Sequence, residues 1–276
     1  MSCLYIVGTP IGNLLDMSKR AIDTLKTVDF IIAEDCRVSL KMLNSYCIKK
    51  PLFSFHKFSS EERANKLVRK IKNGETAALI SDAGMPIISD PGDILVKLCH
   101  ENYINVKVVP GPCALVAALC VSGMYCGRFT FFGFLPINNK DRINAITFLK
   151  TLPHTIVLYE APHKLIKTLK DMLKHLKDRK IVIIKELTKI YESVEIFTIS
   201  EAIKCYENKQ NIKGEYVLVV EGCKHIANKN ELSLQDAVTF AKNLIKNGDK
   251  PAIAAKKAAA MSCYRKSDIY NNIFKI

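Results

Sequence analysis

The stretch CLYIVGTPIGN, residues 3–13, places a short apolar run directly before a loop that contains two glycines and a proline. A run of this kind predicts a buried strand, and the spacing of apolar residues after the loop predicts a helix. The same unit, a short apolar run followed by a segment with helical spacing, recurs along the chain. We expect strands over residues 3–8, 29–33, 77–81 and 106–109, alternating with helices over 18–27, 37–46, 61–72 and 92–101.

A second series of the same kind begins after an alanine-rich helix over 114–121, which ends near Gly123. The alternation predicts an α/β fold with two α/β domains, residues 1–123 and 124–222. The first sheet should be largely parallel, and the second mixed, because its last two strands are joined by a short helix. In the second domain we expect strands over 129–134, 155–159, 181–184, 194–199 and 216–220, with helices over 142–150, 164–176 and 201–208.

Residues 223–276 predict a small basic helical tail after a polar, linker-like stretch over 222–230. Residues 224–276 hold ten Lys or Arg and four Asp or Glu, a net charge of +6. Helices are expected over 233–247 and 252–260, followed by a last short helix capped by Ser267 and Asp268. Basic helices in series favour an RNA-docking appendage, and the alternative is a tail that only adds solubility.

The whole chain of 276 residues carries 41 Lys or Arg against 27 Asp or Glu, a formal charge of +14. Such an excess favours a polyanionic partner, although a lysine-rich composition would give the same balance. Apolar runs are too short to span a membrane and the N-terminus lacks the features of a signal peptide, so we expect a cytoplasmic protein. The ten cysteines have no CxxC spacing and the six histidines no i, i+4 pair, so we predict buried, reduced cysteines and no metal.

Three unusual loops follow strands, over residues 8–13, 81–92 and 109–114. The second, SDAGMPIISDPG, holds two Ser-Asp pairs, two prolines and two glycines, and such a loop is rigid and allows a ligand to approach the backbone. Because the strands are expected to be parallel, these loops should meet at one edge of the sheet and form a ligand site there. Pro10 removes a backbone donor that a pyrophosphate would use, and no third glycine follows, so a nicotinamide-dependent oxidoreductase with Glu34 or Asp35 on the ribose is the weaker interpretation.

These residues resemble the tetrapyrrole (corrin/porphyrin) methylase superfamily, and within it the members that methylate ribosomal RNA. The resemblance extends from residue 3 to about 222, and the basic tail is similar too. The chain departs from the family pattern mainly in the loop 56–61, where only His56 is kept, and this puts contacts with the substrate in doubt more than the cofactor site. The matching segments are residues 4–14, 34–37, 81–92, 110–112, 132–136, 159–164, 185–189 with Glu192, and 213–215.

The resemblance implies a homodimer that binds S-adenosylmethionine between its two α/β domains. It also implies methylation of the 2′-hydroxyl of a cytidine ribose in the decoding region of small-subunit (16S) ribosomal RNA, with the assembled 30S subunit as the expected substrate. The alternative function is methylation of a small-molecule tetrapyrrole in the same cleft. Carried over by position, the residues expected to bind the cofactor are Pro10, Ala83, Gly84, Met85, Ile88, Ser89, Tyr159, Glu160, Leu187 and Gly214.

Methyl transfer to a ribose hydroxyl requires alignment of the hydroxyl with the methyl group, and a proton acceptor assists this weak nucleophile. Glu34, Asp35 and Glu186 are the candidate acceptors, with Arg37 and Lys189 as partners for phosphate or hydroxyl groups. Each of these five residues can instead belong to a structural ion pair. Our preferred hypothesis is Asp35 acting together with Arg37.

Overall fold

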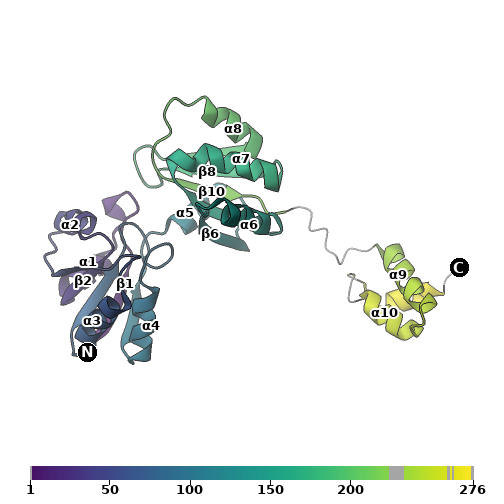
Figure 1. Ribbon diagram of the computed structural model, residues 1–276, viewed down its shortest axis with the longest axis horizontal. Coiled ribbons are helices and arrows are strands. Elements are labelled where there is room, and N and C mark those ends of the chain that lie inside the picture. Colours follow the sequence, from purple (N-terminus) through teal and green to yellow (C-terminus); the bar gives the residue numbers. More distant parts are fainter. Residues whose placement is uncertain (1, 224–232, 260–261, 263, 275–276) are drawn as a thin grey trace. The chain divides into compact units, whose positions relative to one another are not determined.

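The computed structural model describes residues 2–223, 233–259, 262 and 264–274 (Figure 1). The chain forms two compact units. The first contains residues 1–149 and 155–221, and the second contains residues 150–154 and 222–276. The division into domains at residues 123 and 222 stays a proposal.

The first sheet of the larger unit is entirely parallel and has the strand order β3-β2-β4-β1-β5. Strand β1 lies between β4 and β5, with Leu4 opposite both Ala77 and Val106. The largely parallel sheet expected from the sequence is therefore confirmed. Its strands are β1 (Cys3–Val7), β2 (Phe30–Ala33), β3 (Leu52–Ser54), β4 (Thr76–Ile80) and β5 (Asn105–Val109).

Helices cover both faces of this sheet because alternate residues of each strand point to opposite sides. Leu4 and Ile6 pack against helices α3 (Glu61–Lys72) and α4 (Asp93–Glu101). Val7 packs on the other face, which is covered by α1 (Lys19–Thr27) and α2 (Cys36–Ser45). The result is a three-layered α/β/α arrangement in which every parallel strand ends at the same edge.

The second sheet has the order β6-β7-β10-β8-β9 and is mixed, as expected: β6 and β7 are parallel and the other pairs antiparallel. Helix α5 (Ala114–Ser122) follows β5 of the first sheet and buries Leu115 and Leu119 against this second sheet. The strands are β6 (Phe129–Phe134), β7 (Thr155–Glu160), β8 (Lys180–Lys185), β9 (Ser193–Thr198) and β10 (Tyr216–Val220). The helices that follow are α6 (Asn139–Lys150), α7 (Leu165–Leu176) and α8 (Ile199–Glu207).

The described residues of the smaller unit form three helices, α9 (Leu234–Lys246), α10 (Pro251–Ala259) and α11 (Lys266–Ile273), around a core rich in alanine. The last helix begins one residue before Ser267, so the predicted cap at Ser267 and Asp268 is wrong. Arg265 is the N-cap residue, and Asp268 accepts a hydrogen bond from its backbone nitrogen at 3.3 Å. Most of the predicted linker, residues 224–230, lies outside the described residues.

The sequence analysis missed strand β3, because only three residues form it and nothing in their pattern distinguishes them from a loop. The expectation that the cysteines are buried is wrong for Cys47, Cys120 and Cys126, which are exposed.

Among the described residues, no helix has the length and apolar character needed to span a membrane.

Candidate active site

Backbone hydrogen bonds join the three special loops at the carboxyl edge of the first sheet. Gly8 donates to the Val109 carbonyl at 3.0 Å, and Thr9 and Gly84 exchange two bonds of 2.9 and 3.2 Å. A side chain at Gly8 would come within 2.7 Å of the backbone of Gly111, so only glycine allows this close approach. The loops after β1, β4 and β5 are therefore fixed to one another, as their sequence predicted.

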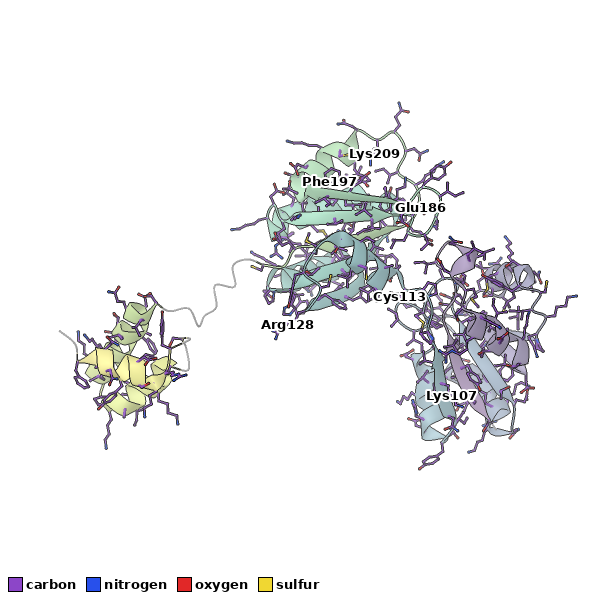
Figure 2. All side chains as sticks on the ribbon, turned by 180° about the vertical axis from the view of Figure 1, so that it is seen from behind. Lys107, Cys113, Arg128, Glu186, Phe197 and Lys209 are labelled. Atoms are coloured by element: carbon purple, nitrogen blue, oxygen red, sulfur yellow. The ribbon has the colours of Figure 1, made fainter. Side chains whose placement is uncertain are left out.

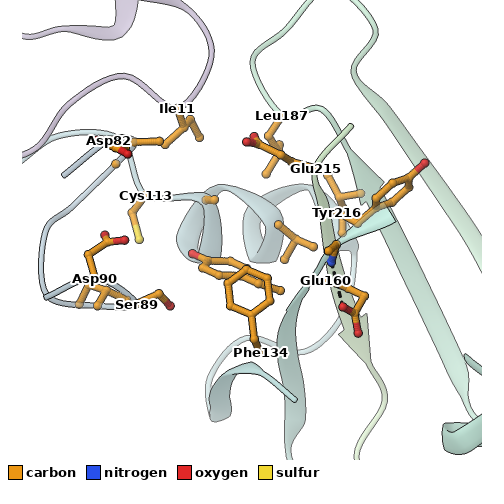
Figure 3. A pocket seen from close by; sticks show the side chains of 18 of the residues that line it. Ile11, Asp82, Ser89, Asp90, Cys113, Phe134, Glu160, Leu187, Glu215 and Tyr216 are labelled. Carbon is orange, nitrogen blue, oxygen red and sulfur yellow. Dashed lines mark hydrogen bonds between the residues drawn. The ribbon is translucent and has the colours of Figure 1, made fainter. Parts of the chain in front are cut away.

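A pocket of about 380 Å³ opens beside these loops, with walls from both sheets (Figure 3). Its volume lies in the range of sites for small molecules and cofactors. The first sheet contributes Ile11, Asp82, Ala83, Gly84, Met85, Ile88, Ser89 and Asp90, and the start of α5 contributes Cys113 and Ala114. The second sheet and its loops contribute Phe134, Tyr159, Glu160, Ala161, Pro162, Ile184, Leu187, Gly214, Glu215, Tyr216 and Val217.

One side of the pocket is acidic. Asp82 and Asp90 line it, and burial raises the pKa of each carboxyl group, with mutual repulsion between the two adding to the pKa of Asp90. Burial also raises the pKa of the nearby Glu34, and the charges of Asp90, Asp82 and Asp35 raise it further. No lysine or arginine is among the described residues that line the pocket. This charge distribution suits a cationic ligand and opposes a phosphate.

The opposite side is aromatic. The ring of Tyr159 packs edge-on against Phe131 and Phe134, with centroid distances of 4.9 and 5.7 Å. Its hydroxyl oxygen accepts a hydrogen bond from the backbone nitrogen of Leu115 at 3.0 Å, at the start of α5. Burial raises the pKa of Tyr159 to about 12, so the hydroxyl stays protonated at neutral pH. The wall presents flat apolar surface with one polar group at its end.

The structure brings together nine of the ten residues expected to bind the cofactor. Pro10 is not among the described residues that line the pocket, although its neighbour Ile11 is. The nine that do line it are Ala83, Gly84, Met85, Ile88, Ser89, Tyr159, Glu160, Leu187 and Gly214.

The carboxylate of Glu160 is engaged in a buried network. Glu160 is only 4% exposed. Its carboxylate accepts hydrogen bonds from the Ala161 backbone nitrogen at 2.8 Å and from the Thr168 hydroxyl. Thr168 in turn accepts from Arg142 at 2.6 Å, and Arg142 pairs with Asp171 at 2.7 Å. Glu160 therefore fixes the turn after β7 that forms part of the pocket wall.

None of the five candidate catalytic residues is among the described residues that line the pocket. Asp35 is the N-cap of α2: one carboxylate oxygen accepts from the Arg37 backbone nitrogen at 2.8 Å, and the other pairs with the Arg37 guanidinium at 2.7 Å. These bonds from Arg37 lower the pKa of Asp35 to about 2. Lys189 forms ion pairs with Glu186 and Glu215, each at 2.9 Å. These two ion pairs join the loop after β8 to the loop before β10.

Several lining residues were missed by the sequence analysis. Asp82 and Asp90 belong to the motif over 81–92, and their position beside small residues was the available signal. Phe134 and Tyr216 enter the pocket only because the second sheet lies next to the loops of the first, and no local pattern marks them. Ile87, in the same motif, has a φ of +79°, which is unfavourable for a β-branched residue and typical of functional sites.

The fold and the pocket define a class of α/β proteins that hold a small cationic or neutral ligand at the carboxyl edge of a parallel sheet. The family model "Tetrapyrrole (Corrin/Porphyrin) Methylases" matches residues 3–203. The chain belongs to this family.

Among its relatives, proteins called "Ribosomal RNA small subunit methyltransferase I" are similar over nearly the full length. The protein from Haemophilus influenzae is 42% identical over 273 residues, which cover 97% of this chain and 94% of that protein. The protein from Bacillus subtilis is 41% identical over 98% of this chain and 94% of its own length. The similarity therefore includes the three-helix unit, which lies beyond the family model.

Solved structures show the same fold at low identity. Diphthine synthase has a TM-score of 0.64 at 12% identity, covering 79% of this chain and 89% of its own. Uroporphyrin-III C-methyltransferase from Thermus thermophilus, in complex with S-adenosyl homocysteine, has a TM-score of 0.55 at 16% identity, covering 80% of this chain and 97% of its own.

Proposed function

We propose that this protein is an S-adenosylmethionine-dependent methyltransferase that methylates the 2′-hydroxyl of a cytidine ribose in the decoding region of 16S ribosomal RNA. One observation carries the proposal: a relative called ribosomal RNA small subunit methyltransferase I matches 97% of the chain, including the three-helix unit. The net charge of +14 agrees with an RNA substrate.

The pocket fits the proposed cofactor. S-adenosylmethionine supplies a methyl group activated by a positively charged sulfonium, so its net charge is positive. Asp82 and Asp90 provide a negative environment for that charge, and Ala83 and Gly84 leave room for close approach of the backbone. The apolar and aromatic wall around Tyr159 excludes water from the other side. We propose that the nine lining residues named above, with Pro10 beside them, hold the cofactor.

The residue that accepts the ribose proton stays a prediction. Asp35 with Arg37 was the preferred pair, but a carboxylate whose pKa is about 2 is a weak base. We therefore propose that Asp35 and Arg37 orient the loop, and that the proton passes to the group of carboxylates Glu34, Asp82 and Asp90. Burial raises the pKa of all three, which makes them stronger bases than an exposed carboxylate. For Glu186 and Lys189 we propose a supporting role through their ion pair.

We also propose that the substrate is the assembled 30S subunit, that the enzyme acts as a homodimer, and that it works in the cytoplasm. Exposed lysines on the three-helix unit, such as Lys246, Lys256 and Lys266, are suited to bind phosphates of the RNA. Phosphate contacts position a protein without reading sequence, so this unit would strengthen binding and leave the choice of nucleotide to the pocket.

The test is methyl transfer from labelled S-adenosylmethionine to purified small subunits that lack the modification, followed by digestion and identification of the labelled nucleotide. Label in 2′-O-methylcytidine is the expected result. No label in subunits or free RNA, despite tight binding of S-adenosylhomocysteine, would refute the RNA substrate and favour a small-molecule tetrapyrrole as the methyl acceptor.

A further inference from the structure

Three exposed side chains follow β2 and β3, the edge strand of the first sheet and its neighbour. Arg37 follows β2, and its side chain is 90% exposed. Lys57 and Phe58 follow β3, and Phe58 is 89% exposed. We name Arg37, Lys57 and Phe58 the flank. A phenylalanine exposed to this degree makes few contacts that would stabilise the fold, so its side chain is available to a partner.

The loop that carries Phe58 is well held. Phe55 donates to the Ala33 carbonyl at 2.7 Å, and His56 donates to the Ser59 hydroxyl at 2.9 Å. The backbone nitrogen of Phe58 donates to Nδ1 of His56 at 3.2 Å. With its backbone bonded in this way, the loop presents the ring to solvent in a defined position, which lowers the entropy lost when a partner binds.

The flank lies on a short path from the pocket. All strands of this sheet are parallel and in the order β3-β2-β4, so the loops after them form a row. The loop after β4 lines the pocket, and its Asp82 accepts a hydrogen bond from the Asp35 backbone nitrogen at 3.2 Å. Neighbouring strands are about 4.8 Å apart, which places the loop after β3 about 10 Å from the loop after β4. Stacked nucleotides are spaced about 3.4 Å apart, so the flank is two to three nucleotides from the pocket.

The charges along this row favour an RNA strand that passes over the flank. The carboxylates of Glu34, Asp82 and Asp90 near the pocket repel phosphates, whereas Arg37 and Lys57 beyond them attract phosphates. Arg37 uses Nε and Nη2 to bind Asp35, and the described part of the chain shows no hydrogen bond from its Nη1. An exposed aromatic ring beside a cation, as Phe58 is beside Lys57 in the chain, is the combination that binds unpaired nucleotides, through stacking on the base and contact with the phosphate.

We propose that Arg37, Lys57 and Phe58 form a docking surface for unpaired RNA nucleotides two to three positions from the methylated one, with a base stacked on Phe58. This inference rests on the proposed function, because it assumes that the substrate is RNA. It adds a site outside the pocket that selects the strand conformation presented to the cofactor.

The test compares Phe58→Ala, Phe58→Leu and Phe58→Tyr in the full-length protein, with unmodified small subunits as substrate. Tyr103 is a matched control, because it is 97% exposed and lies between α4 and β5, at the opposite edge of the sheet. For Phe58→Ala and Phe58→Leu we expect the KM for subunits to rise roughly 10- to 100-fold, with kcat unchanged, as for loss of one base stack. Phe58→Tyr and Tyr103→Ala should behave like the unsubstituted protein.

Binding of S-adenosylhomocysteine should be the same in all variants, because Phe58 is not among the described lining residues. Lys57→Gln should reduce the slope of log affinity against log salt concentration by about 0.7. An unchanged KM for Phe58→Ala, or full activity of Phe58→Leu, would overturn the stacking proposal. Methylation of RNA by the unsubstituted protein would in that case still support the proposed function. If the unsubstituted protein labels no RNA, fluorescence anisotropy with a labelled single-stranded oligoribonucleotide decides this proposal, and equal affinity of Phe58→Ala would overturn it.

Discussion

Replacement of Thr168 by valine tests the buried network behind the pocket. Valine has nearly the same shape as threonine but lacks the hydroxyl group that joins Arg142 to Glu160. Thr168 is 0% exposed and Glu160 4%, so water cannot replace the lost hydrogen bonds. A hydrogen bond to a charged group contributes about 1.5–3 kcal/mol, and two such bonds are lost.

Each charged group keeps one partner, Ala161 for Glu160 and Asp171 for Arg142. The expected loss is therefore near the lower limit of the sum, about 3 kcal/mol of unfolding free energy. For a unit of this size that corresponds to a decrease in Tm of roughly 6–12 °C. Because Glu160 fixes Ala161 in the pocket wall, binding of S-adenosylhomocysteine should weaken as well.

Urea unfolding followed by circular dichroism measures the change in stability, and calorimetric titration measures cofactor-product binding. The control is Thr24→Val, because within the described residues the Thr24 hydroxyl bonds only to the Arg20 carbonyl, one turn earlier, at 2.7 Å. Its effect should stay within about 0.5 kcal/mol. A loss below about 1 kcal/mol for Thr168→Val, with unchanged ligand binding, would refute the role assigned to the network.

Three further predictions concern the pocket and its rim. Gly84 has a φ of +82°, and a side chain there would lie 3.1 Å from Ile11, so Gly84→Ala should cost about 1–2 kcal/mol of stability in urea unfolding and weaken S-adenosylhomocysteine binding. The pKa of Asp35 is lowered to about 2, so its contribution to stability is present above pH 4 and is lost as the pH falls toward 2. Acid unfolding of Asp35→Asn should therefore show a weaker pH dependence between pH 4 and pH 2. Equal unfolding curves for the two proteins would contradict the role of Asp35 as a stabilising helix cap. Tyr159→Phe removes the acceptor for Leu115 and should weaken ligand binding, whereas in the unsubstituted protein spectroscopic titration should find one tyrosine with a pKa of about 12.

Local patterns in the sequence contained most of the information about secondary structure. Helix α3 and strands β6 and β10 begin and end at the expected residues, because their apolar spacing and flanking residues are unambiguous. Strand β3 was missed because three residues carry too little pattern, and it forms through pairing with β2. The nature of the first loop was also readable in part, since Pro10 removes a backbone donor that a pyrophosphate would use.

The sequence by itself determined the α/β class, the parallel and mixed sheets, and the loops that meet at one edge, because these follow from the local alternation of short apolar strands with amphipathic helices. Only the tertiary structure decided how side chains from distant segments share a site. It placed Phe134 and Tyr216 opposite Asp82 and Asp90 and directed the Glu160 carboxylate toward Thr168. These outcomes depend on strand order and on the packing of one sheet against the loops of the other, and no local pattern encodes either.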